Sequence, residues 1–139
     1  MGKTWNRYPT REFQFWAYRV SLGLALIRSP SKGEGNHNVD LVFYGVKYLS
    51  LPSVLGTIRV AIAYGDEAEH LRALLRPEFR ADSNEAFVIE EGSRRHYVMA
   101  AGCDVYENWG DLFDDTLQRI VKSEPSQLLR RVERLALAE

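Results

Sequence analysis

Residues 12–28 read EFQFWAYRVSLGLALIR, and the way this stretch folds decides the architecture of the chain. As a strand, its alternate positions from Trp16 to Leu26 are all apolar, and the positions between them are small or polar. As a helix, it offers an apolar stripe from Phe13 to Ile27. The unbroken alternation matches a strand better, and Gly23 disfavours a helix interior but suits a bend or bulge. We therefore expect one long strand over residues 12–28.

Further strands are expected on the C-terminal side of this stretch, after a loop rich in glycine, proline, serine and asparagine at residues 29–38. Runs of β-branched and aromatic residues predict strands at 39–49 and 57–64. Two more strands, at 86–90 and 96–106, flank a turn that contains a glycine. The order of these strands suggests an antiparallel meander.

Three helices complete the expected elements. The first begins at Gly65 with Asp66 as its N-cap and stops before Pro77, because proline disfavours helical geometry in the preceding residue. The second covers residues 113–121, where apolar residues recur at helical spacing. The third is capped by Ser123, carries Pro125 in its first turn and buries one apolar face. That face comprises Leu128, Leu129, Val132, Leu135 and Ala136.

These elements predict the α+β class and a single domain over residues 1–139. We expect a mainly antiparallel sheet of about five strands in the order βββαββαα. One helix follows the third strand, and two C-terminal helices pack on one face of the sheet. Residues 1–11 are expected to form a loosely ordered N-terminal arm.

The composition is that of a globular domain and limits the partners. Of 139 residues, 18 are Lys or Arg and 19 are Asp or Glu, which gives a formal net charge of −1. We therefore expect no nucleic-acid partner. The single cysteine excludes an intrachain disulfide and suits a reducing compartment. The apolar run Val20–Ile27 is too short for a membrane span and lacks a cleavage motif, so we expect a cytoplasmic protein with no membrane partner.

Charge is unevenly distributed along the chain in spite of this neutral total. Residues 1–59 hold eight basic and three acidic residues, whereas residues 60–118 hold five basic and thirteen acidic residues. Residues 119–139 hold five basic and three acidic residues. If the fold keeps these segments apart, the molecule has a basic side and an acidic side, which favours a protein partner or a second copy of the chain.

Aromatic residues are the main candidates for an interface or a ligand site. Several of them are interleaved with arginine near the N-terminus, a combination enriched at protein interfaces. Core packing explains some of the rings, and a platform for single-stranded nucleic acid lacks a recognition-fold signature here. The candidates are Trp5, Tyr8, Phe15, Trp16, Tyr18, Tyr44, Tyr48, Tyr97 and Trp109.

Small residues follow one another at Ala100, Ala101 and Gly102 in the last predicted strand. A strand of small residues lets a backbone or a large ring approach closely, so Trp16 or Tyr44 would find space opposite them.

The acidic run that begins at Asp104 is a weak candidate for a metal site. Asp104, Glu107 and Asp111 are carboxylates of the kind that bind Mg²⁺ or Ca²⁺, but their spacing is not that of a calcium loop. Asp111 is better explained as the cap of the following helix. The three histidines show no metal-like spacing, and Cys103 is expected to be a buried, inert thiol. We therefore assign no catalytic residue and no cofactor.

Three functions remain open. The favoured one is a non-enzymatic protein-interaction module, either of the immunity or adaptor type or a homodimer subunit, which uses aromatic and charge-segregated surfaces. The alternative is a domain that binds a small apolar ligand in a pocket between the sheet and the helices, lined by Tyr44, Tyr48, Tyr97 and Met99. The third is a metal-dependent hydrolase, which requires the three acidic candidates to converge on one point.

Overall fold

The computed structural model describes residues 2–33, 36–80, 83–123 and 126–138, and it confirms the α+β class. The strands are β1 (Glu12–Arg19), β2 (Leu24–Ser29), β3 (Asn38–Tyr44), β4 (Tyr48–Ser50), β5 (Val54–Thr57), β6 (Arg59–Ile62), β7 (Glu85–Glu91), β8 (Arg94–Ala100), β9 (Gly102–Asn108) and β10 (Leu129–Arg134). The helices are α1 (Gly65–Leu74) and α2 (Thr116–Lys122), with short 3₁₀ turns η1 (Ser21–Gly23) and η2 (Pro77–Phe79). The antiparallel strands form one sheet in the order β10-β9-β3-β2-β1-β5 and a second in the order β4-β8-β7-β6.

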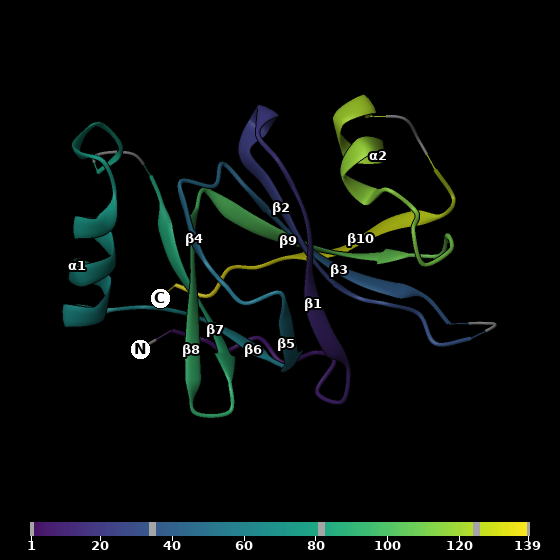
Figure 1. Ribbon diagram of the computed structural model, residues 1–139, viewed down its shortest axis with the longest axis horizontal. Helices are drawn as coiled ribbons and strands as arrows, with labels where there is room; N and C mark the ends of the chain where they lie inside the picture. The colour runs from purple at the N-terminus through teal and green to yellow at the C-terminus, as the bar shows by residue number, and fades with distance from the viewer. Residues whose placement is uncertain (1, 34–35, 81–82, 124–125, 139) are drawn as a thin grey trace.

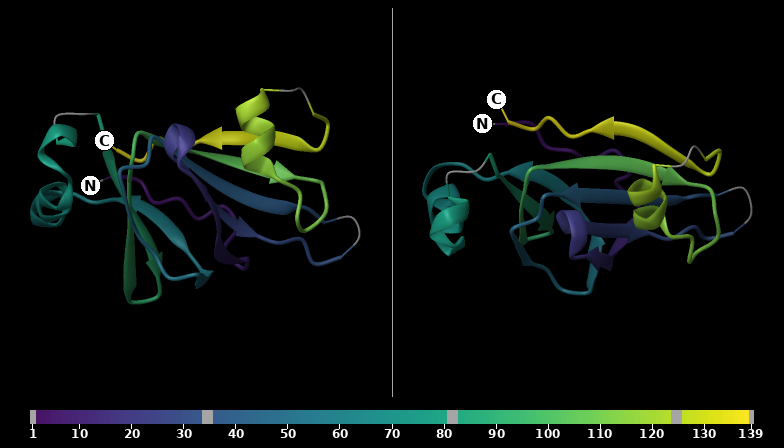
Figure 2. Two further views of the ribbon diagram at one scale, coloured as in Figure 1. Left: turned by 45° about the horizontal axis from the view of Figure 1, so that its top comes forward. Right: turned by 90° about the horizontal axis from the view of Figure 1, so that it is seen from above.

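The two sheets pack against each other, and each carries one helix on its outer face (Figures 1 and 2). The main core lies between the sheets, where Phe43 of β3 meets Phe87 of β7 edge to face at 5.2 Å between ring centroids. Leu71 of α1 packs in a second cluster on the outer face of the four-stranded sheet. Leu117 of α2 packs in a third cluster on the outer face of the six-stranded sheet.

Continuous stretches of chain pass from one sheet into the other and tie the sheets together. β8 continues into β9 through Ala101, and β3 leads into β4 through a turn that begins at Gly45. The two bends are paired, since the Ala101 N–H donates to the Tyr44 carbonyl at 2.9 Å. Gly45 has a φ of +63°, and a Cβ there would lie 2.9 Å from that of Ala101. One bent ribbon therefore belongs to both sheets.

The prediction of one long strand over residues 12–28 is wrong. The segment forms a hairpin of β1 and β2 that reverses direction at η1. Val20 and Leu22, which continue the apolar alternation in the sequence, lie in this turn and are 85% and 69% exposed. The turn is hidden in the sequence because it contains apolar residues, which are uncommon in turns, and these residues continue the alternating pattern.

The predicted count of about five strands is also wrong, because the predicted strands at 39–49, 57–64 and 96–106 are each divided. The first becomes β3 and β4, the second overlaps β5 and β6, and the third overlaps β8 and β9. At Ile58 and Ala101 the chain changes sheet within a single residue, so each division leaves the run of strand-forming residues almost uninterrupted.

The third predicted helix is wrong, since residues 129–134 form the edge strand β10. A β-bulge lies between Arg131 and Glu133, so that Val132 and Leu135 both pack on the core at a spacing of three residues. This spacing imitates a helical stripe. Pro125, which was expected in the first turn of that helix, lies outside the described residues.

The first two helices form close to where they are expected, with different starts. α1 ends at Leu74 before Pro77, but Asp66 lies inside its first turn and no side chain caps it. α2 begins only at Thr116, and its N-cap is Asp115, whose carboxylate accepts from the Gln118 N–H at 3.0 Å.

The N-terminal segment joins the two ends of the sandwich. The Trp5 N–H donates to the Val60 carbonyl at 2.7 Å, and the Val60 N–H donates back at 3.0 Å. The Lys3 N–H donates to the Leu137 carbonyl at 2.9 Å. The indole of Trp5 is buried in the main core.

Among the helices of the described residues, none has both the length and the apolar character that crossing a membrane requires.

Candidate functional site

The outer face of the six-stranded sheet, here called the α2 face, is apolar and only partly covered. Leu24, Leu26, Val42 and Leu117 are buried on it, and Trp16, Ala17, Tyr44, Tyr106, Ile120 and Val121 are partly buried. A helix of seven residues is about 10 Å long and about 10 Å wide. Six strands span about 24 Å. α2 therefore leaves much of this face uncovered.

Two hollows open on the α2 face beside the helix. One has a volume of about 230 Å³ and lies on the β9 side, and the other has about 180 Å³ and lies on the β1 side. The first is lined by Leu24, Val42, Tyr44, Asp104, Tyr106, Ile120 and Arg134. The second is lined by Trp16, Ala17, Leu26, Phe113, Asp114 and Asp115. The lining of the first hollow is mainly apolar, whereas the second combines apolar side chains with the carboxylates of Asp114 and Asp115.

Exposed apolar residues lie in the loop before α2 and in η1. Phe113, in the loop before α2, is 78% exposed, and Val20 and Leu22 project from η1. Figure 2 shows η1 and α2 side by side on the same side of the sheet, and Arg19 at the end of β1 donates to Gln118 of α2. Leu22 has a φ of +66°, a conformation that costs a non-glycine residue on the order of 1 kcal/mol. Neither the exposure nor the strain serves the core.

A buried ion pair lies on the α2 face, under the loop that precedes α2. Arg28 of β2 and Asp40 of β3 are both fully buried, and the guanidinium donates Nε–H to Oδ1 at 2.7 Å and Nη2–H to Oδ2 at 3.0 Å. Thr116 completes the group, since its hydroxyl accepts from Arg28 at 3.0 Å and donates to Asp40. The guanidinium also lies 5.4 Å from the Trp16 ring centroid. This geometry satisfies both buried charges.

The same group holds the backbone of the loop at residues 109–115. Arg28 donates to the carbonyls of Leu112 and Asp114, each at 2.8 Å. Asn38 of β3 donates to the Asp111 carbonyl at 2.9 Å. Asn108 at the end of β9 donates to Thr116 at 2.7 Å. We call Arg28, Asn38, Asp40, Asn108 and Thr116 the Arg28 network.

The Arg28 network therefore fixes a loop whose tip is solvent-exposed. Phe113 stands on this tip with its ring 6.5 Å from that of Trp16. Rigid presentation of an exposed aromatic side chain is typical of binding loops on a stable scaffold.

Three aspartates of this loop differ in their partners. Asp114 pairs with Arg119 at 2.7 Å and accepts from Asn108 at 2.9 Å, and the hydrogen bonds from Arg119 lower the pKa of its carboxyl. The Asp111 carboxylate accepts from the Phe113 N–H at 2.9 Å, and the Asp115 carboxylate caps α2. Within the described parts of the chain, neither Asp111 nor Asp115 forms an ion pair.

The weak metal candidates bind separate groups. Asp104 pairs with Arg134 at 2.9 Å, and Glu107 pairs with Arg130 and accepts from the Tyr8 hydroxyl at 3.0 Å. The Asp111 side chain binds its own loop. Among the residues that the structure describes, no group of three or more histidine, cysteine or acidic side chains could hold a metal ion.

His37 and Trp109 form an aromatic pair where β3 begins and β9 ends. Their ring centroids are 4.5 Å apart, and His37 Nε2 lies 3.3 Å from a Glu107 oxygen. Burial lowers the pKa of His37, which favours the neutral ring. Trp109 remains 45% exposed and begins the loop that carries Phe113.

The other aromatic candidates lie in several parts of the molecule. Trp5 and Phe15 belong to the main core, and Tyr48 and Tyr97 pack with α1 on the four-stranded sheet. Tyr18 is exposed near the end of β1. Trp16 and Tyr44 belong to the α2 face.

Tyr44 occupies the space that the small residues of β9 leave. A Cβ on Gly102 would lie 2.1 Å from the Tyr44 hydroxyl oxygen, so the hydroxyl end of the Tyr44 side chain lies against this glycine. The Arg134 guanidinium covers it at 5.6 Å from the ring centroid.

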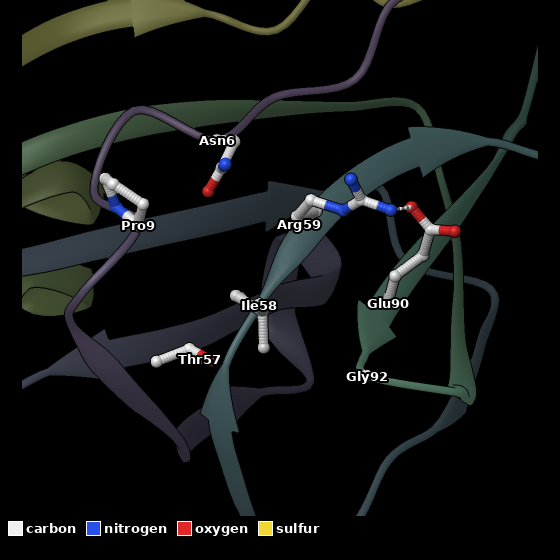
Figure 3. Close-up of a pocket in the computed structure, with 7 residues that line it drawn as sticks. All are labelled: Asn6, Pro9, Thr57, Ile58, Arg59, Glu90 and Gly92. Carbon is white, nitrogen blue, oxygen red and sulfur yellow. Dashed lines mark ion pairs between the residues drawn. The ribbon is translucent and has the colours of Figure 1, made fainter.

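The residues of the expected ligand pocket are separated, because Tyr44 lies on one sheet and Tyr48, Tyr97 and Met99 pack on the other. A hollow of about 250 Å³ lies elsewhere, between the N-terminal segment and β6 (Figure 3). Its charged groups, Arg59 and Glu90, point toward each other at 3.6 Å. It is smaller than typical ligand pockets of about 300–1,000 Å³ and its charges are paired, so it offers little for a ligand.

The uneven charge of the sequence is partly neutralised by folding. Arg130 and Arg134 of the basic C-terminal segment pair with Glu107 and Asp104 of the acidic segment. Among the described residues, Asp111 and Asp115 of the loop before α2 take no part in these ion pairs.

Sequence reasoning missed the Arg28 network and the exposed tip. The available signal was Arg28 and Asp40 themselves, since a charged residue inside an apolar strand must find a partner when it is buried. Comparison with known proteins finds no matching family model, no matching curated protein and no matching solved structure.

Proposed function

We propose that this chain is a non-enzymatic protein-interaction module and that its partner docks on the α2 face. The observation that carries the proposal is the Arg28 network, which fixes the loop at 109–115 while leaving Phe113 exposed. Five buried polar side chains hold a segment whose aromatic tip contributes little to the core.

The apolar surroundings of the tip support the same function. Val20, Leu22 and Phe113 are exposed, Phe113 lines one of the two hollows, and the other hollow has a mainly apolar lining. Neighbouring exposed apolar residues on a soluble protein mark interaction sites more often than single ones do. Aromatic residues at such sites contribute much of the binding energy.

A photo-crosslinking amino acid at position 113 tests this proposal. We expect ultraviolet light to produce an adduct of one defined mass in cells that express the variant. The adduct should be competed by unlabelled wild-type protein but not by the Phe113→Ser variant. Phe113→Ser should leave the free energy of unfolding within about 0.5 kcal/mol of wild type, because the side chain is exposed.

The matched control places the same crosslinker at Leu74, which is exposed on α1 at the other face of the molecule. Equal adduct formation from positions 113 and 74, or no adduct from position 113, would show that the α2 face is not a docking site.

A further inference from the structure

We infer that the partner of the α2 face is a protein with a basic surface around an apolar pocket, and that Phe113 enters this pocket. The inference rests on the proposed function and adds the chemistry of the partner. It combines the exposed ring with the charges that flank it.

The charges around Phe113 leave a negative excess. Asp111 and Asp115 stand two residues on either side of the ring, and in the described chain their carboxylates accept from backbone N–H groups. Two of the cations nearby are neutralised by carboxylates: Arg28 binds Asp40, and Arg119 binds Asp114. Arg19 donates to the amide of Gln118 rather than to a carboxylate.

The sign of this charge distinguishes between classes of partner. Phosphate groups of a nucleic acid or of an anionic membrane would be repelled by Asp111 and Asp115. Lysine and arginine side chains would be attracted, and rim charges of this kind mainly speed association and fix the register of the complex. A basic protein surface is therefore the occupant that the site favours.

The ring and the charges have separate roles in such a complex. Phe113 would supply the desolvated anchor, because its exposed ring can be buried completely by a pocket. Asp111 and Asp115 would remain at the rim, where salt screens them. The loop backbone is already held by Arg28 and Asn38, so little ordering is needed on this side.

The double variant Asp111→Asn/Asp115→Asn tests the charge without disturbing the loop. Asparagine keeps the side-chain oxygen that accepts from the Phe113 and Gln118 N–H groups, so the turn and the cap of α2 should persist. The matched control is Asp66→Asn/Glu69→Gln, which removes the same charge from exposed positions on α1.

Both double variants are made with the crosslinker at position 113, and adduct formation is measured at low and at high salt. We expect the loop variant to form the adduct about 10-fold more slowly than wild type at low salt, with a much smaller difference at high salt. The α1 variant should resemble wild type. A short poly-L-lysine peptide should compete with adduct formation, whereas poly-L-glutamate should not.

The outcomes separate the two proposals. If the adduct forms but the loop variant does not slow it, or if the adduct contains a second copy of this chain or a peptide without lysine and arginine, the inference about the partner is wrong and the docking site stands. If position 113 yields no adduct, both proposals fail. Urea unfolding of each variant shows whether a loss of binding has a folding cause.

Discussion

Arg28 links the interior of this protein to its surface. Its side chain is fully buried, and its N–H groups bind a carboxylate, a hydroxyl and two loop carbonyls. Lysine could not replace it, because a single ammonium cannot reach acceptors that lie in several directions around a planar guanidinium. A charged residue in an apolar strand is thus the structural basis of the exposed loop.

Replacing Arg28 with methionine should destabilise the fold strongly. The substitution leaves Asp40 buried without its partner and removes the donors to two carbonyls, for which we expect a loss of about 3–5 kcal/mol in the free energy of unfolding. The double variant Arg28→Met/Asp40→Leu should lose less than Arg28→Met alone, since no unpaired charge remains. Urea denaturation measures each value.

The control for this prediction is Arg59→Met. Arg59 is exposed and lies 3.6 Å from Glu90, so its loss should cost less than about 1 kcal/mol. Equal losses for the two arginines would contradict the assigned role of Arg28.

At the scale of elements, two segments differ from the sequence prediction for the same physical reason. Periodicity identifies an element only while its backbone stays regular. The bulge in β10 spaces its buried apolar residues as in a helix, so the sequence of this strand resembles a helix. The apolar residues of η1 continue the alternation of β1 and β2, so the sequence of the hairpin resembles one strand. Both errors occur where apolar residues do not lie on the buried face of a regular element. At η1 these residues border the proposed docking face.

The segment that contains α2 should be sensitive to acid. Hydrogen bonds from Arg119 hold the pKa of the Asp114 carboxyl below its ordinary value of 3.8. The stabilisation is present above that value and is lost as the pH falls through the lower pKa of the folded state. We expect the free energy of unfolding to fall more steeply for wild type than for Asp114→Asn between about pH 5 and about pH 2.

Urea denaturation over that range tests this expectation, with Asp66→Asn as the control. Asp66 is exposed on α1 and forms no ion pair with the described residues, so its variant should follow the wild-type slope. Parallel curves for wild type and Asp114→Asn would count against a stabilising ion pair in the folded protein.

At the scale of the whole molecule, the N-terminal segment completes the sandwich. Trp5 pairs with Val60 of β6, and Lys3 pairs with Leu137 after β10. The segment therefore joins β6, an edge strand of the four-stranded sheet, to the residues that follow β10, an edge strand of the six-stranded sheet.

Trp5→Ala should destabilise the fold by about 3–5 kcal/mol, because a large buried ring is removed from the main core. Trp109→Ala is the matched control: its ring is partly exposed, so a loss of roughly 1 kcal/mol is expected. Urea denaturation compares them, and a Trp5→Ala variant as stable as Trp109→Ala would mean that the segment is dispensable.

The α+β class and the approximate positions of α1 and of the β7–β8 hairpin were predictable, because local signals such as Pro77 and a glycine turn mark them. The arrangement of the strands in two sheets was not predictable, since at Ile58 and Ala101 the chain passes from one sheet to the other within a single residue. Of the candidate site residues, Trp16 and Tyr44 lie on the α2 face and Trp109 begins the loop beside it. The Arg28 network that holds this loop joins residues far apart in the sequence, such as Arg28 and Leu112. Such pairings depend on the tertiary fold.

The ribbon shared by both sheets also determines how a partner would meet this protein. Because β8 and β9 are one continuous strand bent at Ala101, the sheets cannot rotate relative to each other without breaking backbone hydrogen bonds. The junction is not a hinge, so we expect the proposed docking face to keep its shape when a partner binds. Recognition would then follow a lock-and-key course, in which the loss of conformational entropy on association falls mainly on the partner.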